Sequence, residues 1–339
     1  MSRETLEHLN TNTLIGYTDK RGNAWHYRAE KQGAESNHYA GAIPVDDVVR
    51  RLFAWRGVEG EISATALTET GVLSTVDPER KAIMRSDTGA ILGVFKSGYR
   101  IHQYKDWLIE NVEMLLDADL AIGSAGLLKG GAVAWVQIEM EDTLEAPGGV
   151  KYRPFLTAAT SMDGSIATTY QTGAQVVVCD NTLSTALASK DSSRFKVKHS
   201  RFSLNKVQDV RDALGIVHTV ASDFEAQVQA LIDEQVNADR WRAFVAAHTE
   251  IDKAREAKSK RGITLAENKS AELNRLWNHD ERVSPWAGTA YGVLAAVNTY
   301  THHVATVRNA TRVERNMERA VTGGIDRLDA DTLRVLATV

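Results

Sequence analysis

The chain has little cysteine, little proline and no long apolar run. A single cysteine among 339 residues excludes an internal disulfide and fits a reducing compartment. Five prolines, with no tract of one charge sign, predict little disorder. A bilayer-spanning helix needs about 20 apolar residues, and residues 1–12 are polar without a signal-peptide core. We therefore expect no membrane partner and a cytoplasmic location.

Sequence signatures of catalysis are also missing. The chain contains no G-x-S-x-G, phosphate-binding loop, H-E-x-x-H or C-x-x-C pattern. We therefore expect no enzyme, no cofactor, no bound metal and no catalytic residue. Two alternatives stay open. The acidic cluster of Glu139, Glu141, Asp142 and Glu145 could hold a divalent metal, as in a nuclease that uses Glu139 and Glu141, or form a solvated strand edge. Cys179 could pair with His199 as a nucleophile or be a buried thiol.

The remaining composition is that of an ordinary globular protein. Hydrophobic residues make up 43% and charged residues 25%. Net charge is −4, so affinity for nucleic acid would have to come from a local basic surface.

Apolar patterning predicts an α+β fold, in which a mixed or antiparallel sheet core with helices precedes a long helical C-terminal region. We divide the chain into an N-terminal arm (1–45) with a small α/β segment (1–89 together), an α+β core (90–204) and a helical region (205–339).

Local patterns predict individual elements within these segments. A turn is expected at Asp163-Gly164. Strand-like runs lie at 90–95, 132–140, 155–160 and 175–179. Short helices are expected after Pro44 and over 104–118 and 181–189.

The helical region carries a heptad-like seam, by which we mean the apolar residues spaced three and four apart from Val207 to Leu231. This seam predicts a long amphipathic helix packed against another helix. Further helices are expected to open at Thr264 and at Ser284-Pro285, the latter running to about Arg319. So long a seam also predicts a homo-oligomer, although an intrachain bundle could bury it.

A basic segment lies between residues 190 and 206. It holds one acid, Asp191, and six basic residues: Lys190, Arg194, Lys196, Lys198, Arg201 and Lys206. Phe195 and Val197 alternate with Lys196 and Lys198, which is typical of a strand with one basic face. Such a strand suits a groove that follows phosphates and stacks bases. The alternative is a solvated edge strand that lysines protect from aggregation.

A second basic feature is a stripe of four arginines spaced by four, three and four: Arg308, Arg312, Arg315 and Arg319. On a helix they would share one face. They could hold phosphates, or pair with carboxylates of another subunit or of the same chain.

Several segments resemble a phage/plasmid-like family with a domain of unknown function, family 932. The residues that carry this resemblance are Thr160 to Ser165, Val176 to Leu183, Gly98-Tyr99-Arg100 and Phe195 to Ser200, and it covers roughly residues 90 to 335. The resemblance implies a phage or mobile-element origin and a link to replication and recombination. The strand order is also similar to that of single-strand annealing proteins, which form rings or filaments and bind DNA in a basic groove without a nucleotide cofactor.

The sequence therefore favours a non-enzymatic protein that binds or anneals single-stranded DNA in the host-cell cytoplasm. The expected nucleic-acid-binding residues are Tyr99, Arg100, Arg194, Phe195, Lys196, Lys198, Arg201 and Lys206, with Tyr99 or Phe195 stacking on bases. The alternative is a phage interaction or counter-defence protein that binds a host protein through its helical surface.

Overall fold

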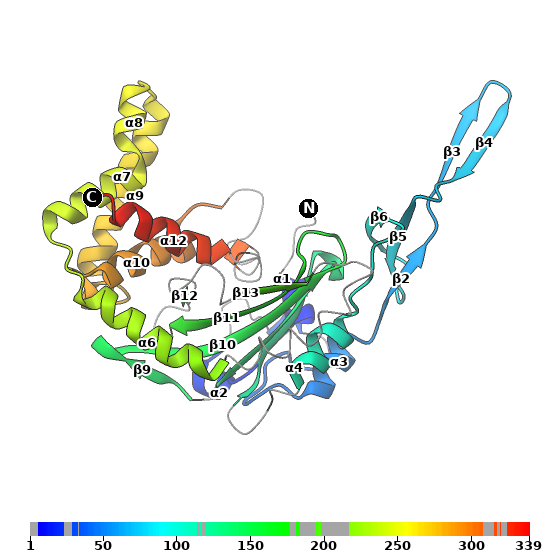
Figure 1. The fold of residues 1–339 in the computed structure, drawn as a ribbon, viewed down its shortest axis with the longest axis horizontal. Coiled ribbons are helices and arrows are strands. Elements are labelled where there is room, and N and C mark those ends of the chain that lie inside the picture. The colour runs from blue at the N-terminus through cyan, green and yellow to red at the C-terminus, as the bar shows by residue number, and fades with distance from the viewer. Residues whose placement is uncertain are drawn as a thin grey trace. The chain divides into compact units, whose positions relative to one another are not determined.

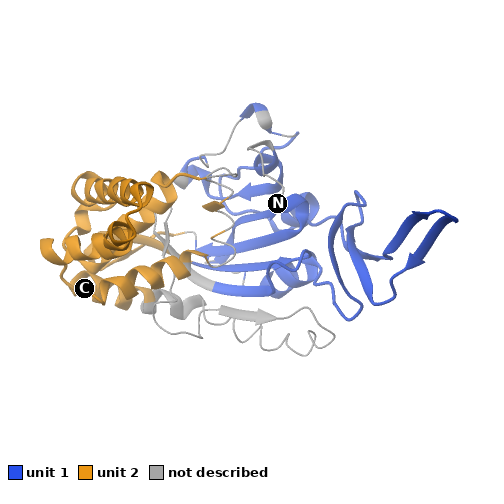
Figure 2. Ribbon diagram, turned by 90° about the horizontal axis from the view of Figure 1, so that it is seen from above, with its two compact units in different colours: residues 1–141, 155–171, 194–216 blue, residues 142–154, 172–193, 217–339 orange. Residues whose placement is uncertain are grey.

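The computed structural model describes residues 6–23, 29–32, 34–113, 116, 120–140, 142–176, 181–183, 194–197, 217–307, 315–316, 319 and 324–339. The chain forms two compact units (Figure 2). Unit 1 comprises residues 1–141, 155–171 and 194–216, and unit 2 comprises residues 142–154, 172–193 and 217–339. The fold class is α+β, as the sequence predicted, with antiparallel sheets in the N-terminal half and helices in the C-terminal part.

A large sheet forms the centre of unit 1 (Figure 1). Its strands are, in spatial order, β1 (Thr13–Ile15), β7 (Leu120–Leu128), β8 (Val133–Met140), β10 (Val150–Ser161), β11 (Thr168–Val176) and, beside β11, β13 (Arg194–Val197). Where registers are defined, the pairs are antiparallel. Strands β10 and β11 continue into unit 2, where β9 (Leu144–Ala146) and β12 (Asn181–Leu183) pair with them.

Helix α3 (Val45–Leu52) packs against β7, and the π-helical turn η2 (Lys105–Glu110) packs against β8. Helix α4 (Asn111–Glu113) continues η2. The helix expected after Pro44 is confirmed. Pro44 precedes its first turn, and Val48 and Leu52 are fully buried. On the covered face of the sheet lie apolar side chains such as Val136 and Leu156.

The N-terminal residues differ from the extended arm that we expected over 1–45. They form α1 (Leu6–Asn12), β1, α2 (Thr18–Arg21) and the short turn η1 (Ala29–Lys31). Leu9, Leu14 and Tyr17 are buried, and β1 completes an edge of the large sheet. Elements this short show too few periods in a sequence to be recognised, and their pairing with β7 is nonlocal.

Unit 1 also contains two small sheets. One consists of β2 (Gly57–Gly60), β5 (Arg80–Arg85) and β6 (Ile91–Lys96), and the other is the hairpin of β3 (Ser63–Thr68) and β4 (Gly71–Val76). The hairpin extends away from β2, β5 and β6 (Figure 1). Two short turns, η3 (Lys129–Gly131) in unit 1 and η4 (Pro147–Gly149) in unit 2, complete the strand-rich part.

Unit 2 is mainly helical. Its elements are α6 (Val217–Asp233), α7 (Ala238–Thr249), α8 (Ile251–Glu256), α9 (Lys260–His279), η7 (Ser284–Trp286), α10 (Ala290–Thr299), η8 (Tyr300–Val304) and α12 (Gly324–Leu336). In α6, the seam residues Phe224, Val228 and Leu231 are buried in one apolar core with α7, α9 and α10. The seam is thus buried over these residues, while 207–216 lie outside the described residues.

Three expected helices are corrected. The helix expected to open at Thr264 begins at Lys260, where the Ser259 side chain accepts a hydrogen bond from the amide of Gly262. The helix predicted from Pro285 to Arg319 is broken: η7 ends at Trp286, Gly288 has φ of 94°, and α10 begins anew with the Thr289 side chain capping the amide of Gly292. Asn181–Leu183, expected as the start of a helix, pair instead with β11 as a strand. Pairing with a neighbouring strand overrides a weak local helix signal.

Among the described residues, none of the helices combines the length and the apolar content needed to cross a bilayer.

Candidate nucleic-acid interface

Strand β13 places the described part of the basic segment at the edge of the large sheet. Phe195 pairs with Tyr170 of β11, and Lys196 pairs with Thr169. The strand expected here is confirmed over Arg194–Val197. Because strand residues alternate between faces, positions 194 and 196 share one face and positions 195 and 197 share the other. Lys198, Arg201 and Lys206 lie outside the described residues.

The two faces of β11 differ in what covers them. The Tyr170 hydroxyl donates to the carbonyl of Trp107 in η2 at 2.5 Å, so the face of positions 168 and 170 is the helix-covered one. Thr169 and Gln171, opposite positions 196 and 194, lie on the other face, and both are polar and buried. The register therefore separates the basic positions of β13 from the face occupied by Tyr170.

Tyr99 lies in the turn that follows β6, and its ring is already engaged. It stacks face to face on Phe95, with ring centroids 3.9 Å apart and an angle of 12° between the rings. Its hydroxyl donates to the carbonyl of Ser161 at 3.3 Å. Burial, together with the charge of Asp163, raises the pKa of Tyr99, so the phenol stays neutral near pH 7.

Arg100 is the exposed cation beside Tyr99. Within the described part of the chain, no carboxylate forms an ion pair with it and no acceptor is hydrogen-bonded to its guanidinium. An exposed guanidinium that lacks a partner within its own chain can bind phosphate without first breaking a contact.

A hydrogen bond brings this turn to β11 and β13. His102 Nδ1 lies 2.5 Å from Thr168 Oγ1, and the His102 ring stacks on Trp107 at 3.9 Å. Thr168 is in turn paired with Val197, the last residue of β13. Tyr99 and Arg100 therefore lie near the end of the sheet at which the chain leaves β13 toward Lys198. The pairing of His102 with Thr168 was not foreseen, and its only sequence signal was the proximity of His102 to Gly98-Tyr99-Arg100.

The arginine stripe belongs to unit 2, and half of it lies outside the described residues, namely Arg308 and Arg312. Arg315 donates to the backbone carbonyl of Thr301 in η8. Together with burial and His303, Arg315 and Arg319 lower the pKa of His302 to about 4. These two arginines thus lie close to η8 of their own chain, in line with the intrachain alternative.

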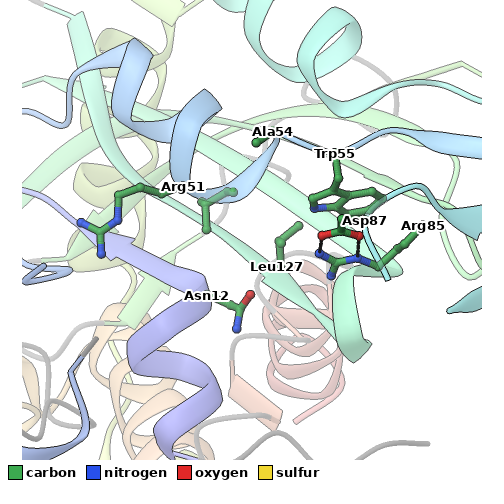
Figure 3. A pocket seen from close by; sticks show the side chains of 8 residues that line it. Asn12, Arg51, Ala54, Trp55, Arg85, Asp87 and Leu127 are labelled. Carbon is green, nitrogen blue, oxygen red and sulfur yellow. Dashed lines mark hydrogen bonds and ion pairs between the residues drawn. The ribbon is translucent and has the colours of Figure 1, made fainter. Parts of the chain in front are cut away.

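A pocket of about 180 Å³ opens in unit 1 (Figure 3) and is lined by Asn12, Arg51, Leu52, Ala54, Trp55, Arg85, Asp87 and Leu127. One cation of this pocket, Arg85, is neutralised by residues of the same chain. Arg85 lies 4.1 Å from the ring centroid of Trp55 and is bound by both carboxylate oxygens of Asp87, at 2.7 and 3.0 Å. This contact lowers the pKa of Asp87. We therefore assign the pocket no part in phosphate binding.

Only part of the acidic cluster at the end of β8 and after it is solvated. Glu139 is buried and lies against Gly123 of β7, whereas Asp142 and Glu145 are exposed and Glu141 lies outside the described residues. Within the described ranges, no three His, Cys, Asp or Glu side chains gather as a metal-binding group. Cys179 and His199 also fall outside those ranges.

Comparison with known proteins identifies one family. The model of the family described as "Domain of unknown function (DUF932)" matches residues 91–322, which include β6, the Tyr99 turn, β13 and most of the helices. No curated protein and no solved structure matches the chain significantly.

Proposed function

This chain belongs to the DUF932 family, and from the arrangement around β13 we propose that it binds and anneals single-stranded DNA without an enzymatic step. The observation that carries the proposal is the position of Arg100. It is exposed, has no ion pair within the described residues, and lies beside the half-buried Tyr99 at the sheet end where β13 leads into Lys198. Cations next to an aromatic ring form the kind of surface that follows a single strand.

The register of β13 determines which of its residues would contact phosphate and which would not. Arg194, Lys196 and Lys198 alternate with Phe195 and Val197 along the strand, so phosphate contacts would run along one face of the edge. Position 195 lies opposite the buried Tyr170, on the face that η2 covers. The stacking residue would be Tyr99 or Phe195, and the position of residue 195 favours Tyr99. Arg201 and Lys206 would extend the phosphate contacts. A strand held through its backbone keeps its base edges free to pair with a complement.

We place this activity in the cytoplasm of a host cell, in replication or recombination of a phage or another mobile element. The alternative, binding of a host protein through the helical surface, has less support. The described seam residues Phe224, Val228 and Leu231 are buried within unit 2. Among the described residues of that unit, the large apolar side chains that are exposed are Leu265 and Val339.

The test is fluorescence anisotropy of labelled single-stranded and duplex oligonucleotides over a salt series, with magnesium and with EDTA. We expect single-strand binding at low salt that does not need magnesium. Each phosphate contact contributes about 0.7 to the slope of log K against log salt on single strands. Combined replacement of Lys196, Lys198 and Arg201 by alanine should therefore flatten that slope by about 2.

A matched control removes the same charge elsewhere. Lys253, Arg255 and Lys260 are exposed on α8 and α9, and their combined replacement by alanine should leave the slope unchanged. Circular dichroism establishes that both triple variants are folded. Absence of single-strand binding by the wild-type protein would refute the proposal, as would equal slopes for the two triple variants.

A further inference from the structure

The hairpin β3–β4 is exposed along its whole length. Each of its residues is solvent-exposed, including Leu67 at 87%, Val72 at 68%, Leu73 at 62% and Val76 at 50%. Leu67 and Val72 are directly paired, and Val76 lies on the same face. A lone two-stranded hairpin is at best marginally stable in water, and exposed apolar patches of this kind mark interaction sites.

The charge of the hairpin argues against nucleic acid as its partner. Residues 61–77 contain three acids, Glu61, Glu69 and Asp77, and no lysine, arginine or histidine. A phosphate backbone would be repelled by such a segment. Its partner should therefore present apolar side chains with positive charge nearby.

This chain itself carries such a surface. On the sheet β2–β5–β6, register places Val58, Ile91 and Val94 on one face together with Met84. Val58, Ile91 and Val94 are exposed at 43%, 65% and 52%. At one end of that face Arg80 pairs with Lys96 across the strands. Arg80 lies 3.9 Å from Asp77, while Lys96 has no ion pair within the described residues.

We propose that the β3–β4 hairpin of one copy docks on the β2–β5–β6 face of a second copy. The apolar face of Leu67, Val72 and Val76 would cover Val58, Ile91 and Val94, and the acids beside the hairpin would meet Arg80 and Lys96. The hairpin cannot reach the face of its own chain. Two residues join it to β2 and three join it to β5, and the amide of Asp77 donates to the carbonyl of Ile62 at 2.9 Å across these connections.

The contact joins two different surfaces, so it is heterologous. Each copy offers one hairpin and one face, and repetition of the contact generates a ring or an open filament. This inference does not depend on DNA binding, because the hairpin and its acceptor face use neither Tyr99, Arg100 nor β13. The proposed contact places self-association in unit 1. The heptad-like seam, from which we predicted a homo-oligomer, lies in unit 2 and is buried at Phe224, Val228 and Leu231.

Light scattering coupled to size-exclusion chromatography tests the contact without DNA. We expect the wild-type protein at micromolar concentration to have at least twice the chain mass of 37.3 kDa. Combined Leu67→Ser and Val72→Ser should return it to 37.3 kDa. Combined Ile91→Ser and Val94→Ser should do the same. The matched control, Ala64→Ser with Thr75→Ser, changes a directly opposed pair on the other face of the hairpin and should retain the wild-type mass.

Mixing the two defective variants gives the sharpest result. The Ile91/Val94 variant keeps an intact hairpin and the Leu67/Val72 variant keeps an intact face, so the mixture should form a one-to-one dimer and grow no further. A monomeric wild-type protein would overturn the proposal, and so would a Leu67/Val72 variant that keeps the wild-type mass. A mixture that stays monomeric would also overturn it, because an intact hairpin and an intact face would then fail to associate. An Ile91/Val94 variant that keeps the wild-type mass on its own would overturn it too, because that result indicates hairpin-to-hairpin contact.

Discussion

Tyr99 stacks on Phe95 with ring centroids 3.9 Å apart, and its hydroxyl reaches the carbonyl of Ser161. Tyr99→Phe keeps the ring and loses one hydrogen bond, which contributes about 1 kcal/mol. Tyr99→Ala also loses the stack, so we expect it to lower the free energy of unfolding by about 1–2 kcal/mol more than Tyr99→Phe. Urea denaturation measures both variants. Equal losses would mean that the ring contributes nothing to stability.

A single phosphate contact is predicted for Arg100. Arg100→Ala should reduce the slope of log K against log salt for single-stranded DNA by about 0.7. Because the Arg100 side chain is exposed, thermal stability should not change. Lys253→Ala on α8 is the control of equal charge. If both variants keep the wild-type slope, Arg100 does not contact the strand.

Gly123 and Glu139 are coupled through space. A Cβ atom at position 123 would lie 1.4 Å from Glu139 Oε1, so Gly123→Ala must displace that buried side chain. We expect Gly123→Ala to destabilise the protein by about 1–3 kcal/mol. In a Glu139→Ala background, where the space is open, the same change should cost at least about 1 kcal/mol less. A double-mutant cycle by urea denaturation measures the difference, and additive effects would contradict the clash.

Acid should destabilise the helical unit through His302. Burial is the main reason that the pKa of His302 falls to about 4, and the charges of His303, Arg315 and Arg319 add to it. The unfolded chain takes up the proton near pH 6.5 and the folded chain does not, so stability is full above pH 6.5 and falls between pH 6.5 and 4. The loss at pH 4 should approach roughly 3 kcal/mol.

His302→Gln removes this titration. Its unfolding free energy should depend less steeply on pH between 6.5 and 4 than that of the wild-type protein, whatever its stability at pH 7. Part of the dependence should remain, because burial and Lys269 also lower the pKa of His248 to about 4. Parallel pH profiles for the wild-type and His302→Gln proteins would show that His302 is accessible to protons in the folded state.

Much of the fold was accessible from sequence patterns. The alternation over 132–140 predicted β8, the periodicity after Pro44 predicted α3, and Asp163-Gly164 predicted the turn between β10 and β11, where Gly164 has φ of 77°. These signals are local, because each depends on the period of one element. The prediction of one helix from Pro285 to Arg319 was wrong, because the helical spacing of the residues gives no sign of the break at Gly288.

The candidate interface was less accessible. The sequence selected Tyr99, Arg100 and the alternating residues of β13, but it could not show that Phe95 occupies one face of Tyr99 or that position 195 lies opposite Tyr170. It gave no sign of the β3–β4 hairpin, whose residues include alanine, threonine, leucine and valine that could equally have been buried.

The sequence by itself determined the α+β class, the family and the types of most elements, because side-chain periodicity and short motifs act over a few residues. The tertiary structure decided which residues meet and which surfaces remain open. His102 and Thr168 are 66 residues apart and share a hydrogen bond, and Leu67 is exposed while Leu156 is buried. Contact and burial depend on what packs against an element, and that partner is fixed only when distant segments of the chain come together.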